Sequence, residues 1–203
     1  MAIDPPGATV SNWRAELPVL TSRLVTLREP APQDLSALVD LLSASDASRF
    51  GIDDAISELS VSDFLDRVLR DRSAGVSFTF VIVSSASRAV VGLAQVRQLD
   101  IAFETAEWEF TIVPSARSTG AFIESARLVG SFAFGSVGVH RLESRVLLQN
   151  GRANGALRKL GAVQEGLLRR SIRRNGEYMD QVLWSVLKED WGAHWTPTGS
   201  RVH

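Results

Sequence analysis

The sequence A-E-W-E-F-T-I-V-P-S-A-R-S-T-G-A-F-I-E-S-A-R-L-V-G-S-F-A-F runs from Ala106 to Phe134 and decides the fold. Apolar residues first alternate with polar ones, at 108, 110 and 112, which is the period of a β-strand. Pro114 cannot donate to a β-ladder, so the strand is expected to end there. From Ala121 the apolar spacing becomes that of one helix face, at 122, 126, 129 and 133. The stretch therefore predicts a strand, a short polar loop and a helix.

The loop between this strand and this helix has the features of an anion site. Gly120 immediately precedes the helix, and a glycine lets a ligand approach the backbone closely. The first N–H groups of a helix have no partner within it and favour negative charge, most naturally phosphate. An ordinary strand-to-helix connection with one glycine would have the same pattern, so the pattern alone leaves both interpretations open.

Residues 117–122, Arg-Ser-Thr-Gly-Ala-Phe, resemble motif A of the GNAT N-acetyltransferases, which reads Gln/Arg-x-x-Gly-x-Gly/Ala. Arg117 and Gly120 match this motif, whereas Phe122 stands where a small residue is usual. Glu124 matches a glutamate that often follows in one branch, the ribosomal-protein N-terminal alanine/serine acetyltransferases. The resemblance therefore favours the phosphate interpretation of the loop.

Three further segments resemble the same branch, and they occur in the same order. The predicted strand at 20–29 is similar to T-E-R-L-x-L-R, with Ser22 in place of the glutamate. Residues 150–162 are similar to N-x-x-S-x-x-x-x-x-x-L-G-F, with Ala153 in place of the serine. The ending N-G-E-Y-M-D-Q-V-L-W-S, which starts at residue 175, is similar to D-G-x-Y-x-D-x-x-x-Y/W-S. Together the matches cover nearly the whole chain.

These segments predict an α+β (mixed α/β) fold. The resemblance implies a central, mostly antiparallel sheet of about seven strands, splayed near residues 106–147 and flanked by about four helices. We expect an N-terminal arm at 1–19, a single N-acetyltransferase domain at 20–190 and a C-terminal tail at 191–203. Trp191 and Trp195 are expected to hold the tail against the domain.

The composition excludes several classes of function. The net charge is -1, which argues against a general nucleic-acid or anionic-membrane binder. The chain has no cysteine, which excludes thiol nucleophiles and thiolate metal sites, and its 3 histidines are too scattered to suggest a metal site. No apolar run approaches the roughly 18 residues of a membrane span, and the first residues lack a signal-peptide pattern. We therefore expect a cytoplasmic protein, either a monomer or a homodimer.

The resemblance also implies acetyl-CoA as the co-substrate. Its pyrophosphate is expected on the N–H groups of the loop, and its pantetheine arm against the strand, where one N–H would serve the oxyanion. Asn150 is expected to bond the pantetheine, although asparagine is also a common helix N-cap. Asn154 is expected to donate to the leaving sulfur. The predicted cofactor-binding residues are Ile112, Val113, Arg117, Ser118, Thr119, Gly120, Ala121, Phe122, Asn150 and Asn154.

Glu107 and Glu109 are the candidate bases. They lie two residues apart on the predicted strand, so they face the same side. Either carboxylate could take the proton of an incoming ammonium, directly or through water, whereas the alternative is a solvent-facing strand. Related acetyltransferases place a glutamate base at the position of Glu107, and glycine is common at the position of Glu109. The predicted catalytic residues are Glu107, Glu109 and Asn150.

No dedicated acid is expected for the leaving thiolate. Ala153 replaces the serine of the motif, and the sole tyrosine, Tyr178, lies beyond the last hairpin turn. A CoA thiolate can leave near neutral pH without an acid, because thiols have a pKa of about 8.5.

The expected function is an acetyl-CoA-dependent N-acetyltransferase that acts by direct attack on the thioester. The acceptor would be a primary amine, either a protein N-terminus or a small molecule. The alternative is a non-catalytic acyl-CoA-binding or interaction protein of the same fold, which Phe122 and Ala153 favour. Four arginines flank the last hairpin turn, and we interpret them as a solvated surface rather than a nucleic-acid site: Arg169, Arg170, Arg173 and Arg174.

Overall fold

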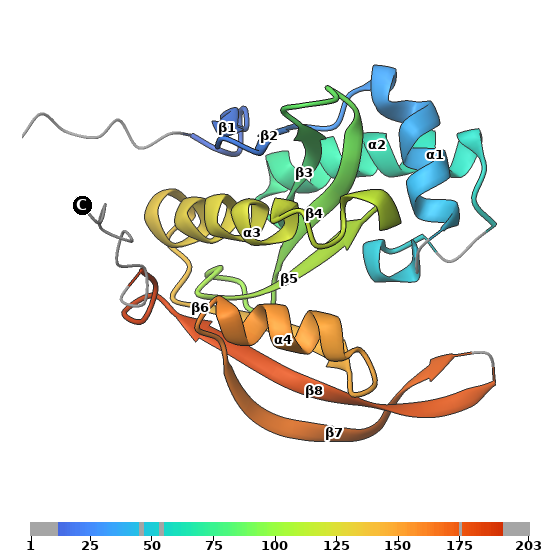
Figure 1. Cartoon of the computed structure of the whole chain (residues 1–203). Coiled ribbons are helices and arrows are strands. Elements are labelled where there is room, and N and C mark those ends of the chain that lie inside the picture. Colours follow the sequence, from blue (N-terminus) through green and yellow to red (C-terminus); the bar gives the residue numbers. More distant parts are fainter. Residues whose placement is uncertain (1–11, 45–46, 53–54, 175, 193–203) are drawn as a thin grey trace, which may run out of the picture.

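The computed structural model describes residues 12–44, 47–52, 55–174 and 176–192 (Figure 1). In this part of the chain, four α-helices surround one sheet of eight strands, in the order β1-β2-β3-β4-β5-β6-β8-β7. The strands are β1 (Leu20–Thr21), β2 (Val25–Arg28), β3 (Ser77–Ser84), β4 (Val90–Gln98), β5 (Thr105–Ile112), β6 (Arg141–Leu147), β7 (Val163–Arg174) and β8 (Glu177–Leu187). The helices are α1 (Leu35–Ser43), α2 (Glu58–Ala74), α3 (Ala121–Phe132) and α4 (Gly151–Lys159). This architecture confirms the predicted mixed α/β fold.

The sheet divides where β5 meets β6. These two strands are parallel, and they pair only from Thr105↔Arg141 to Glu107↔Glu143, whereas the other neighbours are antiparallel. Beyond that point β5 stays on β4 as far as Ile112, and β6 stays on β8 as far as Leu147. We call the unpaired stretch, residues 108–112 of β5 opposite 144–147 of β6, the splay. Its position is the predicted one, and Figure 1 shows β8 and β7 running away from β3 to β5.

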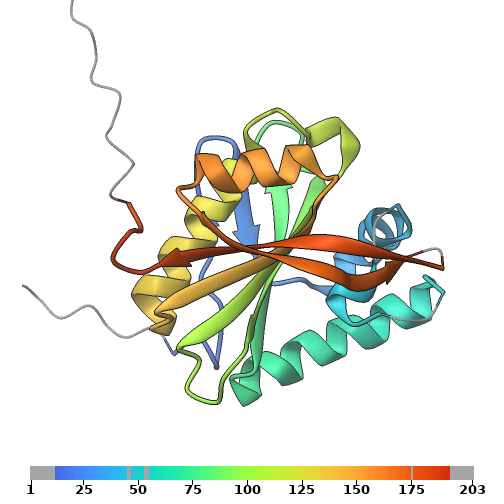
Figure 2. The same ribbon diagram turned by 90° about the horizontal axis from the view of Figure 1, so that it is seen from below.

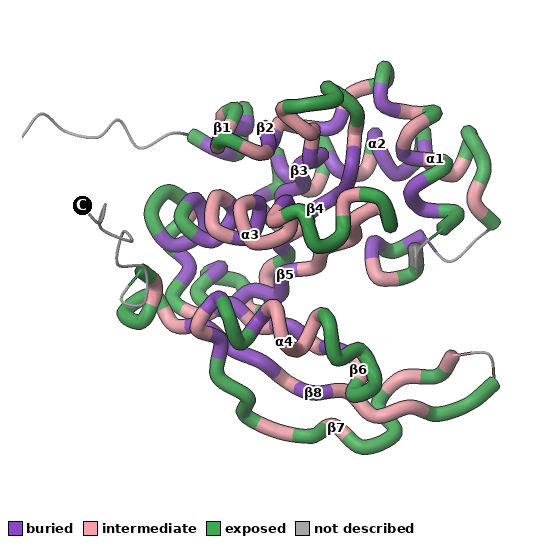
Figure 3. Tube along the Cα trace, viewed as in Figure 1, coloured by how far each residue is buried: buried purple, intermediate pink, exposed green. Residues whose placement is uncertain are grey.

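The two faces of the sheet carry separate cores. On one face, Phe78 and Phe80 of β3 pack with Phe132 of α3 at ring-centroid distances of 5.2 and 5.7 Å. On the other face, Val81 and Leu93 pack against α1 and α2. Figure 2 shows α3 and α2 on opposite sides of the central strands, and Figure 3 shows that these strands are the most buried part of the molecule. Side chains of one strand therefore alternate between the α3 face and the α1–α2 face.

The N-terminal strand differs from its prediction. A single strand at 20–29 is wrong, because the chain turns between β1 and β2, which pair as Leu20↔Leu27. The Ser22 hydroxyl accepts the N–H groups of Leu24 and Val25, each at 3.3 Å, and so closes the turn. Serine often competes for backbone hydrogen bonds in this way. The extra hairpin raises the strand number from about seven to eight.

The chain ends that the structure describes pack against the domain. Trp13 and Leu17, which the prediction assigns to the arm, are buried at 7% and 5% exposure. Trp191 packs on Trp108 and Phe134 at ring-centroid distances of 6.0 and 5.3 Å, as expected for a residue that holds the tail. The rest of the arm and tail, residues 1–11 and 193–203 with Trp195, lies outside the described residues. None of the helices in the described part is long and apolar enough to cross a membrane.

Candidate active site

The free backbone edge of β5 forms the floor of the candidate site. The Val113 N–H donates to the Val91 carbonyl at 2.9 Å, which shows that odd-numbered positions of this strand bond to β4. Even-numbered positions therefore point toward β6, and the Glu104 carbonyl indeed accepts from the Arg141 N–H at 2.9 Å. Because β6 has already separated, the N–H and C=O groups of Phe110 and Ile112 face the splay.

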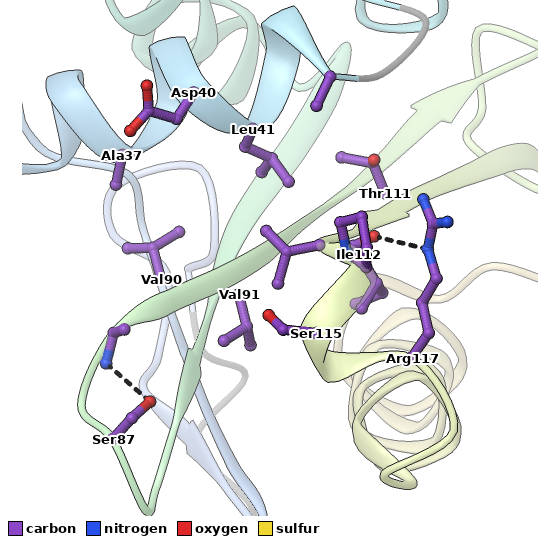
Figure 4. Close-up of a pocket in the computed structure, with 14 residues that line it drawn as sticks. Ala37, Asp40, Leu41, Ser87, Val90, Val91, Thr111, Ile112, Ser115 and Arg117 are labelled. Atoms are coloured by element: carbon purple, nitrogen blue, oxygen red, sulfur yellow. Dashed lines mark hydrogen bonds between the residues drawn. The ribbon is translucent and has the colours of Figure 1, made fainter.

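This geometry changes the backbone contacts that were predicted at Ile112 and Val113. The N–H of Val113 is committed to β4 and so is turned away from the splay. The C=O of Ile112 faces the splay, where it accepts a hydrogen bond from Arg117 Nε at 3.3 Å (Figure 4). The sequence does not predict a backbone contact at Phe110. Alternation along one strand shows which backbone edge is unpaired only when the neighbouring strands are known.

The loop after β5 is folded into a compact anchor for α3. Pro114–Ala116 form a 3-10 turn. The Thr119 hydroxyl donates to the Ala116 carbonyl at 2.7 Å and accepts the Ala121 N–H at 3.3 Å. Gly120 has φ of 92°, a left-handed conformation that glycine adopts without strain. A Cβ there would also lie 3.0 Å from Leu24 Cδ1, so a larger residue would crowd the N-terminal hairpin.

Several N–H groups at this anchor are available to a ligand. Glu124 is the first residue of α3 whose N–H bonds to a backbone carbonyl, that of Gly120, at 3.0 Å. Within the described residues, no acceptor meets the N–H groups of Ser118, Gly120, Phe122 and Ile123. Free N–H groups at the start of a 12-residue helix suit an anion, so the loop fits a pyrophosphate.

Phe122 fits this loop despite its size. Its ring packs edge-on against Phe110, with centroids 5.2 Å apart and an interplanar angle of 72°. The side chain thus packs against the core on the α3 face of the sheet, which accommodates its size. The departure from a small residue therefore leaves the helix start intact.

Two asparagines on the other side of the splay differ in whether their side-chain amide is available to a ligand. Asn150 is the N-cap of α4, because its Oδ1 accepts the Ala153 N–H at 3.1 Å. Its Nδ2 donates to no acceptor in the described part of the chain. The Nδ2 of Asn154 donates to the carbonyls of Leu147 and Asn150 at 3.0 and 2.9 Å, and its Oδ1 accepts Trp184 Nε1–H at 2.8 Å. Asn150 can therefore reach a ligand with its amide, whereas the amide of Asn154 is fully used by the fold.

The two candidate carboxylates lie on the α1–α2 face of β5, and their surroundings differ. Glu107 is only 6% exposed, and it pairs with Arg97 and Arg145, each at 2.6 Å. Glu109 lies two residues further along, inside the splay, with a side chain that is 13% exposed. It pairs with Arg49 from the 3-10 turn Ala47–Phe50, which connects α1 toward α2. The structure thus brings both predicted carboxylates to the mouth of the splay.

A groove of about 420 Å³ opens on the α1–α2 face, lined by Thr111 of β5 and not by either carboxylate (Figure 4). Its walls are α1, the loop between β3 and β4, and the end of β5 with the segment that follows. Leu41, Val90 and Val91 give it apolar surface, and Arg117 and Thr111 line the side next to the splay. Thr111 follows Glu109 on the same strand face, a separation of about 7 Å.

Tyr178 and His140 are both exposed side chains. Tyr178 is 60% exposed on β8 near the last turn, beneath the guanidinium of Arg173 at 5.8 Å. His140 is exposed and lies 3.7 Å from Glu189. The described residues contain no group of three or more histidine, aspartate or glutamate side chains suited to a metal ion.

Comparison with known proteins identifies the fold family. The family description "Acetyltransferase (GNAT) domain" matches residues 24–163. The protein named uncharacterized N-acetyltransferase YoaA of Bacillus subtilis (strain 168) is 25% identical over 178 residues, which is 84% of this chain and 97% of the relative.

Two solved structures share the architecture at low sequence identity. The ribosomal-protein-S5-alanine acetyltransferase of Vibrio fischeri superposes with a TM-score of 0.76 at 15% identity, and covers 86% of this chain and 98% of its own. Mycobacterium smegmatis RimJ, solved in complex with CoA-disulfide, superposes with a TM-score of 0.72 at 20% identity, and covers 85% and 87%. With the family match spanning most of the sequence, the chain belongs to the GNAT acetyltransferase family and is an acyltransferase.

Proposed function

We propose that the protein transfers an acetyl group from acetyl-CoA to a primary amine, by direct attack of the amine on the thioester. The observation that carries the proposal is the free backbone edge of Phe110 and Ile112, which leads directly into the free N–H groups at the start of α3. A linear ligand with a pyrophosphate at one end and an amide-rich arm at the other matches this sequence of donors. The structure of M. smegmatis RimJ with CoA-disulfide supports this class of ligand.

In this proposal the loop holds the pyrophosphate and β5 holds the pantetheine. The N–H groups of Ser118, Gly120, Phe122 and Ile123 would bind the phosphate oxygens, and the Arg117 guanidinium would exchange its bond to Ile112 for one to phosphate. The N–H of Phe110 or Ile112 would stabilise the oxyanion, because a fixed donor acts there without reorganisation. The free amide of Asn150 would approach the thioester from the opposite strand.

The acceptor amine would arrive from the α1–α2 face. Amines are mostly protonated near neutral pH, so a carboxylate must take one proton before attack. Of the two predicted bases, the geometry supports Glu109, which lies inside the splay with one cationic partner. The neutral amine then bonds to the acyl carbon as the bond from that carbon to sulfur breaks, and the second proton of the nitrogen passes to the CoA thiolate, directly or through water. In this proposal the thiolate leaves without a tyrosine acid, because Tyr178 is exposed to solvent near the last turn of the sheet.

Calorimetry with CoA and dephospho-CoA tests the binding step. Gly120→Asp should abolish binding, because it adds a negative charge and a side chain at the left-handed position next to the phosphate donors. Gly135→Asp is a matched control, since Gly135 is exposed beyond α3 and a Cβ there would meet nothing within 4 Å. Wild-type protein that binds neither ligand at millimolar concentration would refute the proposal.

Steady-state release of free CoA with a panel of amines and peptide N-termini tests the transfer step. Tight CoA binding without release for any acceptor would favour the alternative, a non-catalytic CoA-binding protein. The panel should include an N-terminal alanine peptide of ribosomal protein S5, which the name of the V. fischeri acetyltransferase suggests. Release with one acceptor class would define the substrate.

A further inference from the structure

Glu107 has a geometry that differs from that of a free base. Both of its carboxylate oxygens are occupied, since Oε1 accepts from Arg145 Nη1 and Oε2 accepts from Arg97 Nη2, each at 2.6 Å. The carboxylate is 7% exposed, and the two guanidiniums reach it from the strands on either side of β5. Neither oxygen is therefore left free to approach an incoming amine.

These contacts lie where the pairing of β5 with β6 ends. Glu107 stands at the last paired position between β5 and β6, opposite Glu143. Arg145 lies two residues beyond that pair, where the backbone ladder has stopped. Its side chain therefore joins the two halves of the sheet at the first step of the splay.

The contact continues as a row of alternating charges across the second half of the sheet. Arg145 also lies 3.5 Å from Glu143, and Arg141 binds Glu143 at 2.9 Å. Arg141 then binds Glu165 of β7 with two hydrogen bonds, at 2.7 and 2.5 Å. The row fixes the angle at which Arg145 approaches β5, because each guanidinium in it is held by two carboxylates.

We propose that Glu107 is a positioning residue, whose clamp of two arginines fixes the separation of β5 and β6 at the mouth of the splay. This inference rests on the proposed function, because the thioester lies between those strands. The clamp sets how far the thioester sits from Glu109 and from the oxyanion donors on β5. A displacement of about 1 Å at such a site can cost about a hundredfold in rate.

The clamp makes a prediction that a base does not make. Arg145→Met removes one side of the clamp and leaves both carboxylates in place. If Glu107 positions the thioester, Arg145→Met and Glu107→Gln should each lower kcat by about a hundredfold, and the double variant should be no worse than the poorer single variant. If Glu107 is the base, only Glu107→Gln should lose activity.

Three further measurements make the test specific. The ionisation seen in kcat/KM for the amine should persist in Glu107→Gln, because the base is intact. Arg145→Lys should recover part of the activity, because it restores a cation. Arg70→Met, at an exposed position of α2, is the matched control and should behave as wild type. If Glu107→Gln does not fold, Glu107→Asp and the two Arg145 variants still decide the question.

Hydrogen exchange on the ligand-free protein separates this inference from the proposed function. Loss of the clamp should accelerate exchange of those amides in 108–112 and 144–147 that bond to β4 and β8, in both Glu107→Gln and Arg145→Met. If the wild-type protein releases no CoA with any acceptor, the proposed function is contradicted. The hydrogen-exchange measurement would then still show whether the clamp holds the two strands. Unchanged exchange, or full activity of Arg145→Met beside an inactive Glu107→Gln, would overturn the clamp.

Discussion

Gly130→Ala should destabilise the protein through one aromatic ring. A Cβ at Gly130 of α3 would lie 2.3 Å from Cζ2 of Trp191, and the three nearest heavy atoms all belong to that ring. The indole would have to leave its place against Trp108 and Phe134 and lose the hydrogen bond from its Nε1 to Ser131 at 3.1 Å. Overpacking of this kind costs about 1–3 kcal/mol.

The same substitution should become favourable when the ring is absent. Trp191→Ala alone should cost about 2 kcal/mol, roughly half the value for a core tryptophan, because Trp191 is half-buried. In that background nothing opposes the new methyl, and alanine exceeds glycine in helix propensity by about 1 kcal/mol. Gly130→Ala should then stabilise the protein, so that its effect changes sign.

Urea unfolding of the wild type, the two single variants and the double variant measures this cycle. The free energy of unfolding should fall with Gly130→Ala in the wild-type background and rise with it in Trp191→Ala. A loss of stability of the same size in both backgrounds would refute the reasoning, since the cost would then come from the helix itself. Unequal m-values among the four proteins would indicate a change in the denatured state instead.

Three further outcomes are expected. Asn154→Ala should lower the free energy of unfolding by about 2 kcal/mol, because it leaves the indole N–H of the buried Trp184 without its acceptor. Asn150→Ala should cost about 1 kcal/mol as a lost N-cap, and urea unfolding compares the two. Hydrogen bonding from Arg141 lowers the pKa of Glu165 from 4.5 to about 2. Its contribution to stability is present above pH 4.5 and disappears as the pH falls toward 2, so the difference in Tm between wild type and Glu165→Gln should shrink over that range. Arg117→Ala should weaken CoA binding by about tenfold, the size of one charge-assisted bond. Calorimetry at two salt concentrations should show that CoA binding depends less on salt in this variant than in the wild type.

The elements with one strong period were predictable from the sequence. Alternation at 108–112 and the helical spacing after Gly120 each report the side of one element that is buried, so they depend on local sequence alone. The turn inside 20–29 could not be read in this way. Leu20, Leu24 and Val25 are compatible with a continuous strand, and the turn is decided by hydrogen bonds that the Ser22 hydroxyl accepts from the backbone and by pairing with β3.

The candidate site was predictable where a motif carries its own chemistry. The loop 117–122 is contiguous, so its glycine, its threonine and the helix start could be placed together. The surroundings of the carboxylates were not predictable, because Arg49, Arg97 and Arg145 come from three separate segments. The sequence identifies Glu107 and Glu109 as neighbours on one strand face. It cannot show that one is held by two strands of the sheet and the other by the turn between α1 and α2.

These different partners divide the work of the two carboxylates in the proposed mechanism. Glu107 is bound by arginines of β4 and β6, the two strands that flank β5, and so it suits a fixed role. Glu109 is bound by Arg49, which belongs to a 3-10 turn rather than to the sheet. An incoming ammonium carries the same charge as Arg49 and would compete with it for the Glu109 carboxylate. Arrival of the amine would then release Arg49, and the turn that carries it, from Glu109.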